Sequence, residues 1–204
     1  MSESSLGEKR PSGLPARAMA SLATRGLELA EEMTGRIQAL DPEIELKEAE
    51  RHIDQDRPLQ GLETINRIID SDRLTGPRLS WALTLRAFAR TRCGHYKQAV
   101  DDYDRILAMN PRSAGAYAER GVLRQIQGDL EPALTDFNQA LALDPRLAEA
   151  YYNRGLIYEK KGLLSQALRD ARAAWRLNPA HRPFEERVRA LAVKLGKPTG
   201  RTGP

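Results

Sequence analysis

Two kinds of charged residue recur at a fixed interval along the middle of the chain, and they could form either a ligand-binding site or a set of ion pairs. The interval is 34 residues, and in each one an arginine precedes an aspartate by 16 residues. Arginines lining a groove would suit an anionic ligand, but the matched recurrence of both signs favours an Arg–Asp bridge between two helices. This predicted ladder consists of Arg86, Asp102, Arg120, Asp136, Arg154 and Asp170.

Other residues with chemical potential do not gather into a site. Asp101, Asp102 and Asp104 lie at steps of one to three on one predicted helix, so they do not face a single point. We interpret them as a solvated helical face plus the ladder aspartate. The sequence has no phosphate-binding glycine loop, nucleophile elbow or His–carboxylate pairing. Metal-ligand spacing is absent among His52, His95, His181 and Cys93. The sequence therefore predicts no enzymatic activity, no metal and no cofactor.

The elements that must position the charged pairs follow from the same period. A glycine recurs at the centre of each interval, where it suits the tight turn between two helices. An Asn-Pro or Asp-Pro pair recurs near the end, where the residue before proline leaves the α region and ends the second helix. The recurring residues are Gly94, Gly128, Gly162, Ala99, Ala133, Ala167, Asn110-Pro111, Asp144-Pro145 and Asn178-Pro179. The chain therefore contains three units, 80–113, 114–147 and 148–181, each a helix–turn–helix whose apolar face is buried by stacking.

These residues resemble the tetratricopeptide repeat family. The family places aromatic residues at positions 4 and 24, small residues at 8, 20 and 27, and proline at 32. The second unit matches at Tyr117, Gly121, Ala133, Phe137, Ala140 and Pro145, and the third at Tyr151, Gly155, Ala167, Ala174 and Pro179. The first unit is looser, with Leu83, Ala87, Ala99, Tyr103, Ile106 and Pro111. The resemblance implies an all-α fold: a right-handed superhelical solenoid of antiparallel helix pairs. It does not by itself define a functional site.

Segments on both sides of the repeats complete the predicted organisation. Residues 1–15 are expected to be disordered, 16–40 to form an N-terminal helix, and 42–75 to form a degenerate helix pair. Four inserted residues, 76–79, would separate this pair from the three clear repeats of 80–181. Residues 182–195 are expected to form a capping helix whose apolar side covers the last repeat. The tail 196–204 is expected to be disordered and basic.

Charge is concentrated at the C-terminal end. The formal net charge is +4, and residues 182–204 by themselves carry this balance. A solvated cap with a basic tail explains it, and contact with a nucleic acid is the alternative. The chain has no apolar run near 18 residues, no signal-peptide core and a single cysteine. We therefore expect a cytoplasmic protein without a membrane span.

The resemblance also implies where a partner would bind. In the family, the concave surface is lined by first-helix positions near 2, 5, 6, 9, 12 and 13. Family members that bind chaperone tails hold a terminal carboxylate with lysine, asparagine and arginine. Those places here are Thr84, Phe88, Glu119, Glu149 and Asn153, so that clamp is absent. The predicted groove residues are Trp81, Leu85, Phe88, Glu119, Val122, Tyr152, Asn153 and Leu156.

The functional prediction is a non-enzymatic scaffold that binds a protein or peptide partner in this mostly apolar groove. The chain's own helix 16–40 could instead fill the groove. Two other functions stay open: a small secretion-type chaperone that holds an apolar client segment, and a nucleic-acid-associated protein that uses the basic tail. Self-association is a further possibility. Nothing in the sequence identifies the partner.

Overall fold

The computed structural model describes residue 25 and residues 41–196 of the 204-residue chain. The chain divides into two parts, Met1–Asp41 and Pro42–Pro204, and the helices below all belong to the second. The predicted segments 1–15 and 16–40, apart from Arg25, lie outside the described residues, as does 197–204.

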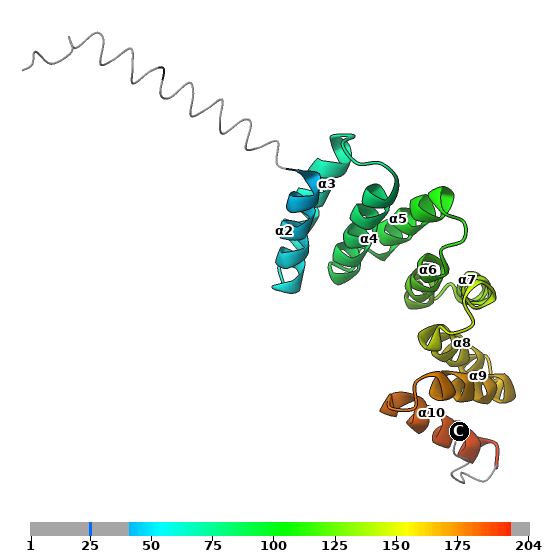
Figure 1. Ribbon diagram of the computed structural model, residues 1–204. Helices are drawn as coiled ribbons and strands as arrows, with labels where there is room; N and C mark the ends of the chain where they lie inside the picture. The colour runs from blue at the N-terminus through cyan, green and yellow to red at the C-terminus, as the bar shows by residue number, and fades with distance from the viewer. Residues whose placement is uncertain (1–24, 26–40, 197–204) are drawn as a thin grey trace, which may run out of the picture. The chain divides into compact units, whose positions relative to one another are not determined.

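The described residues form an all-α solenoid, which confirms the predicted fold class. Each helix packs against the next in the chain, so the helices follow one another in pairs (Figure 1). No strand occurs within 41–196, and no helix in this range is long and apolar enough to cross a bilayer. The helices are α2 (Pro42–Asp54), α3 (Pro58–Asp70), α4 (Gly76–Arg92), α5 (Tyr96–Met109), α6 (Ala114–Gln127), α7 (Leu130–Leu143), α8 (Ala148–Lys160), α9 (Leu164–Leu177) and α10 (Arg182–Lys194).

Glycine makes the turn inside each of the three clear units. Gly94, Gly128 and Gly162 have φ angles of 77°, 90° and 76°, in the left-handed region that side chains disfavour. At the end of α6, the backbone N–H of Gly128 and that of Asp129 donate to the last carbonyls of the helix. The turn therefore satisfies carbonyl groups that the end of a helix leaves unpaired.

The Asn-Pro and Asp-Pro pairs end the second helices. Asn110, Asp144 and Asn178 follow the last residues of α5, α7 and α9, and each has left the helical region, with φ near −138°. In two of these pairs the side chain also supports the turn. Asn110 Oδ1 accepts the backbone N–H of Arg112, and Asp144 Oδ1 accepts that of Arg146. The chain then reverses into the first helix of the next unit.

Small residues let the two helices of a pair approach closely. A Cβ added at Gly121 of α6 would lie 2.9 Å from the ring of Phe137 on α7, which is fully buried. A Cβ at Gly155 of α8 would lie 3.3 Å from Cβ of Asp170 on α9. The close approach brings the charged residues of the first helix against those of the second.

The start of α4 differs from the sequence expectation. Residues 76–79 are not a connecting insertion but the first turn of α4, which makes α4 the longest described helix at 17 residues. Four residues are close to one helical turn, so the added turn keeps the later residues of α4 on the same helix face. The unit 80–113 can therefore pack in the same register as its successors.

Helix α10 packs against α9 at the end of the described chain. Phe184 and Leu191 of α10 are buried, while Val188 and Leu195 are partly buried against a cluster that includes Leu168. These are the residues that the sequence places on the apolar side of the helix. Their burial removes the apolar surface of α9 from water.

Candidate functional site

The six ladder residues meet in three Arg–Asp pairs, one for each unit. Asp102, Asp136 and Asp170 are buried. Each accepts hydrogen bonds from two guanidinium nitrogens of the arginine at position 7 of its own unit. In the second unit, Arg120 Nε lies 3.0 Å from Asp136 Oδ2, and its Nη2 lies 2.6 Å from Oδ1. This bidentate geometry fixes the first helix against the second.

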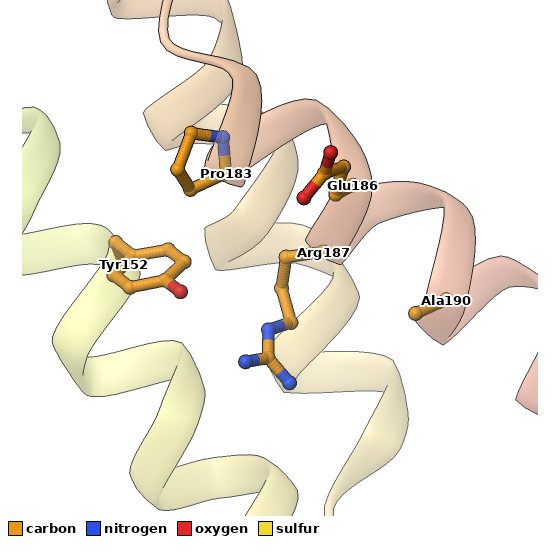
Figure 2. A pocket seen from close by; sticks show the side chains of 5 residues that line it. All are labelled: Tyr152, Pro183, Glu186, Arg187 and Ala190. Carbon is orange, nitrogen blue, oxygen red and sulfur yellow. The ribbon is translucent and has the colours of Figure 1, made fainter.

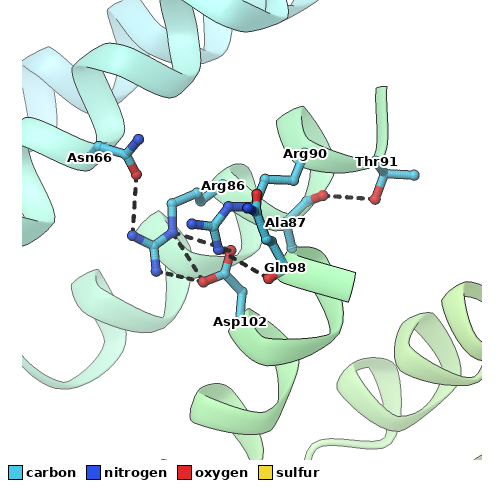
Figure 3. Close-up of polar contacts among 7 residues, drawn as sticks. All are labelled: Asn66, Arg86, Ala87, Arg90, Thr91, Gln98 and Asp102. Atoms are coloured by element: carbon cyan, nitrogen blue, oxygen red, sulfur yellow. Dashed lines mark hydrogen bonds and ion pairs between the residues drawn. The ribbon is translucent and has the colours of Figure 1, made fainter. Parts of the chain in front are cut away.

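A second arginine, which is not among the predicted ladder residues, joins two of the pairs. Arg90 Nη1 donates to Asp102 Oδ2 at 2.6 Å, beside the Arg86 guanidinium (Figure 3). Arg124 Nη1 reaches Asp136 Oδ2 at 2.9 Å in the same way. These arginines lie four residues after the ladder arginines, so the 34-residue recurrence was a visible signal. The third unit has Tyr158 at this position, and Asp170 keeps Arg154 as its ion-pair partner.

The ladder arginines also connect each unit to the one before it. Arg86 Nη1 donates to Asn66 of α3 at 3.3 Å, and Arg154 Nη1 donates to Asn138 of α7 at 2.7 Å. Arg120 pairs with Asp104 of α5 in the same manner. The acceptors all occupy position 25 of the preceding unit. The sequence suggests that Asp104 belongs to a solvated helical face, but in the structure it also forms an ion pair with the next unit. The link from Asn66 supports the proposal that 42–75 is a degenerate unit in the same register.

The helix pair 42–75 is held together differently. Positions 7 and 23 are Glu48 and Thr64, so the ladder pair is missing. Glu45 of α2 is buried instead, and it accepts hydrogen bonds from Arg67 at 3.0 Å and Arg73 at 2.8 Å. All these arginines are engaged with protein carboxylates. The ladder therefore offers no unpaired arginine to a ligand.

The predicted groove residues lie on the first helices α4, α6 and α8, at the positions that face the concave surface in the resembling family. We call the surface made by positions 2, 5, 6, 9, 12 and 13 of these helices and of α10 the first-helix face. The structure distributes its residues unevenly between core and solvent. Phe88 of α4 is 48% exposed, and Ile126 of α6, which the groove prediction omitted, is 51% exposed.

Other predicted groove residues are less accessible. Leu85 is only 8% exposed and belongs to the first core cluster, so its side chain offers little surface to a partner. Trp81 packs against the same cluster, and Val122 packs against the second one. The unit 42–75 extends the core under α4, which explains the burial at this end. Tyr152, Asn153 and Leu156 of α8 are partly buried, while Glu119 of α6 is exposed.

Glu119 is the predicted groove residue with a perturbed charge. Although the residue is exposed overall, desolvation at its carboxyl group raises the pKa of Glu119 above the ordinary value. Burial raises the pKa of the Tyr103 phenol, and the negative charges of Glu119 and Asp102 raise it further. The phenol is therefore neutral beside the carboxylate at neutral pH.

A hollow of about 230 Å³ opens on the first-helix face between α8 and α10 (Figure 2). Tyr152 forms one wall of the hollow. The centroid of its ring lies 5.0 Å from the ring centroid of Phe184 and 5.9 Å from the Arg187 guanidinium carbon. Arg187 and Lys194 both donate to Glu159, and these bonds, with that of Lys194 the stronger, lower the pKa of the Glu159 carboxyl. The lining residues are Tyr152, Pro183, Glu186, Arg187 and Ala190.

The lining of this hollow shows that α10 continues the repeat register. Counting from residue 182, which is 34 after 148, Pro183, Glu186, Arg187 and Ala190 fall at positions 2, 5, 6 and 9. These are the positions that line the first-helix face in the other units. Helix α10 therefore both packs over α9 and occupies the register of a first helix. The apolar pattern of the sequence predicts only a capping helix here, although the 34-residue period also indicates the continued register.

Comparisons with known proteins agree with this register. A family model described as TPR repeat matches residues 126–162, and a model described as tetratricopeptide repeat matches residues 148–181. The second match coincides with the third unit, whose Arg154–Asp170 pair and Gly162 turn are described above. The chain is a tetratricopeptide repeat protein. No curated protein matches its sequence.

Solved structures of tetratricopeptide repeat proteins share the fold. MamA of Desulfovibrio magneticus RS-1 superposes with a TM-score of 0.66 at 19% identity, over 76% of this chain and 85% of that one. A tetratricopeptide repeat protein from Parabacteroides merdae gives 0.67 at 21% identity, over 76% and 60%. The first repeat domain of Spaghetti (RPAP3), bound to an HSP90 peptide, gives 0.57 at 20% identity, over 60% and 98%. These likenesses establish the fold of this repeat protein.

Within 41–196, no group of three or more His, Cys, Asp or Glu residues is placed to hold a metal ion. The carboxylates of the ladder are neutralised by arginines. What the first-helix face offers is partly exposed apolar side chains beside fixed charges, which is an arrangement for binding.

Proposed function

We propose that this repeat protein is a non-enzymatic scaffold that binds a peptide segment of a partner protein on its first-helix face. The observation that carries the proposal is the exposure of Phe88 and Ile126 at positions 9 and 13. Large apolar side chains on a rigid helical surface are suited to anchor an apolar residue of a peptide. The hollow beside Tyr152 supplies a second place for a side chain.

The proposed peptide differs from an acidic chaperone tail. The Spaghetti (RPAP3) domain was solved with the HSP90 peptide SRMEEVD, which has an acidic end. In this chain, the places that would clamp such an end hold Thr84, Phe88, Glu119 and Glu149. Two of these are carboxylates and would repel it. A peptide with apolar anchors and few acidic residues is the better fit.

Capture from a native lysate tests this proposal against a matched control. The face variant is Phe88→Ser/Ile126→Ser. The control is Leu59→Ser/Met109→Ser, which removes two exposed apolar side chains from the second helices α3 and α5. Thermal unfolding first establishes that both variants are folded.

The proposal predicts that wild type and control capture the same protein and that the face variant loses it. Because the contact is apolar, capture should persist in high salt, whereas binding to a nucleic acid would fall steeply. If the face variant captures the same proteins as wild type, the first-helix face is not the binding site.

A further inference from the structure

Three arginines form an exposed basic stripe on α9 that neither the ladder nor the proposed binding face uses. Arg169, Arg172 and Arg176 are spaced by three and four residues, so they lie on one face of the helix, over about 10 Å. All three are exposed. Among the described residues, none of their side chains has an ion-pair or hydrogen-bond partner. We call these three residues the α9 stripe.

The same positions of the other second helices carry different charges. Arg169, Arg172 and Arg176 are positions 22, 25 and 29 of their unit. On α3 these positions hold Glu63, Asn66 and Asp70, which we call the α3 stripe, and both of its carboxylates are exposed. On α5 they are Asp101, Asp104 and Ala108, and on α7 they are Thr135, Asn138 and Ala142. The charge on this face therefore changes from acidic to neutral to basic along the repeats.

The α9 stripe destabilises its own helix, and it does not continue onto α10. Like charges three and four residues apart repel each other on a helix. The stripe is not extended by α10, because Arg182 and Arg189 are paired with Glu186 and Glu185 of that helix. Three guanidinium groups over about 10 Å suit a short acidic helix better than a single-stranded nucleic acid, which is bound by a basic groove that tracks its backbone over several nucleotides.

We propose that the α9 stripe docks on the α3 stripe of a second copy of this chain. Arg169 and Arg176 are seven residues apart, and so are Glu63 and Asp70. Two helices laid side by side in either direction therefore bring both pairs together at once. Asn66 lies between the carboxylates and accepts a hydrogen bond from Arg86 of its own chain, so it adds no third charge opposite Arg172. Stripes of equal charge repel, so α9 does not dock on α9.

Sedimentation of the full chain over a range of concentrations tests the proposal. One variant reverses the basic stripe with Arg169→Glu/Arg176→Glu, a second reverses the acidic stripe with Glu63→Arg/Asp70→Arg, and a third combines all four changes. The control, Arg51→Glu/Arg105→Glu, reverses two exposed arginines that lie off the stripes. All these side chains are exposed, and circular dichroism confirms that each variant is folded.

The average mass of wild type and control should rise with concentration. The association constant should fall at least tenfold between about 0.1 M and about 1 M salt, where the Debye length shortens from about 10 Å to about 3 Å. Each single-stripe reversal should weaken association at least tenfold, and the combined variant should restore it.

Three results would overturn the proposal: a constant wild-type mass at all concentrations in low salt, a combined variant that does not recover association, or a control as weak as the stripe reversals. A single-stranded oligonucleotide serves as a further probe. If it binds wild type and is lost on reversal of the basic stripe, while the protein's mass is unchanged, the stripe serves a nucleic acid instead.

Discussion

Each ladder aspartate is a buried charge that the fold must neutralise. Asp136 is 1% exposed, and it accepts hydrogen bonds from Arg120 and Arg124 of the facing helix. A buried carboxylate without a partner would be costly, whereas a paired one contributes geometry more than net stability. Because Arg120 also pairs with Asp104 of the preceding unit, one guanidinium ties three helices together. The ladder is therefore a device for fixing helices rather than for binding ligands.

Asp136→Ala should lower the free energy of unfolding by about 3 kcal/mol, because it leaves the partly buried guanidinium groups of Arg120 and Arg124 without the carboxylate that they share. Asp104→Ala is the matched control, since its side chain is about half exposed and the pair should contribute less than about 1 kcal/mol. Urea unfolding of both variants gives the comparison. An unchanged unfolding midpoint for Asp136→Ala would contradict the role of the ladder.

Glu119→Gln tests whether the charged Glu119 carboxylate lowers the stability of the folded chain. Desolvation raises the pKa of the Glu119 carboxyl, so the folded chain holds this proton more tightly than the unfolded chain. The resulting stability is present below the unfolded pKa, about 4.3, and is lost as the pH rises through the folded pKa. The variant should therefore be more stable than wild type at pH 7, and its advantage should shrink as the pH falls below about 4. The midpoints of urea unfolding of wild type and variant, at pH 7 and at a pH below about 4, measure this difference in stability. A variant that is less stable than wild type at pH 7 would contradict the prediction.

Helix pairs depend on small residues where their axes come closest. Gly121 of α6 faces the ring of Phe137 on α7, and the distance leaves no room for a methyl group. Gly115 lies on the same helix but has nothing within 4 Å of an added Cβ. The two glycines therefore have different physical roles, and a pair of substitutions can separate them.

Gly121→Ala should destabilise the fold by about 1–3 kcal/mol, because the added methyl group overpacks against a fully buried ring. Gly115→Ala should be neutral or should stabilise it by up to about 1 kcal/mol, since alanine favours the helix. Thermal unfolding of both variants checks the pair. Equal effects would mean that helix propensity, and not contact with Phe137, governs Gly121.

For the whole molecule, periodic features were predictable from sequence and contacts between units were not. The 34-residue spacing of Arg86 and Asp102 with their counterparts was enough to predict the fold class and to nominate the paired residues. The acceptors Asn66 and Asn138 were not assigned, because their role depends on how one unit lies on the next. Their recurrence at position 25 is visible in the sequence, but the sequence of one unit does not show which residue of the next unit they contact.

The candidate site was harder to predict than the fold. The groove residues were selected by resemblance at positions 2, 5, 6 and 9 of the first helices. Leu85, at position 6, is nevertheless buried because the helix pair 42–75 extends the core beneath it. Tyr152 meets Phe184 of α10, a contact that depends on α10 continuing the register beyond the last full repeat. Ile126 was passed over, although its exposure makes it a stronger candidate than Leu85.

Site-specific photo-crosslinking tests the central claim, that partners bind the first-helix face. A photo-reactive amino acid replaces Phe88 or Ile126 in one pair of proteins and Leu59 or Met109 in the control pair. All four positions are at least 44% exposed, so solvent access does not separate the pairs. The account predicts that Phe88 and Ile126 crosslink to the same partner in native lysate and that the control positions do not. Crosslinks to that partner from Leu59 or Met109 alone would contradict it.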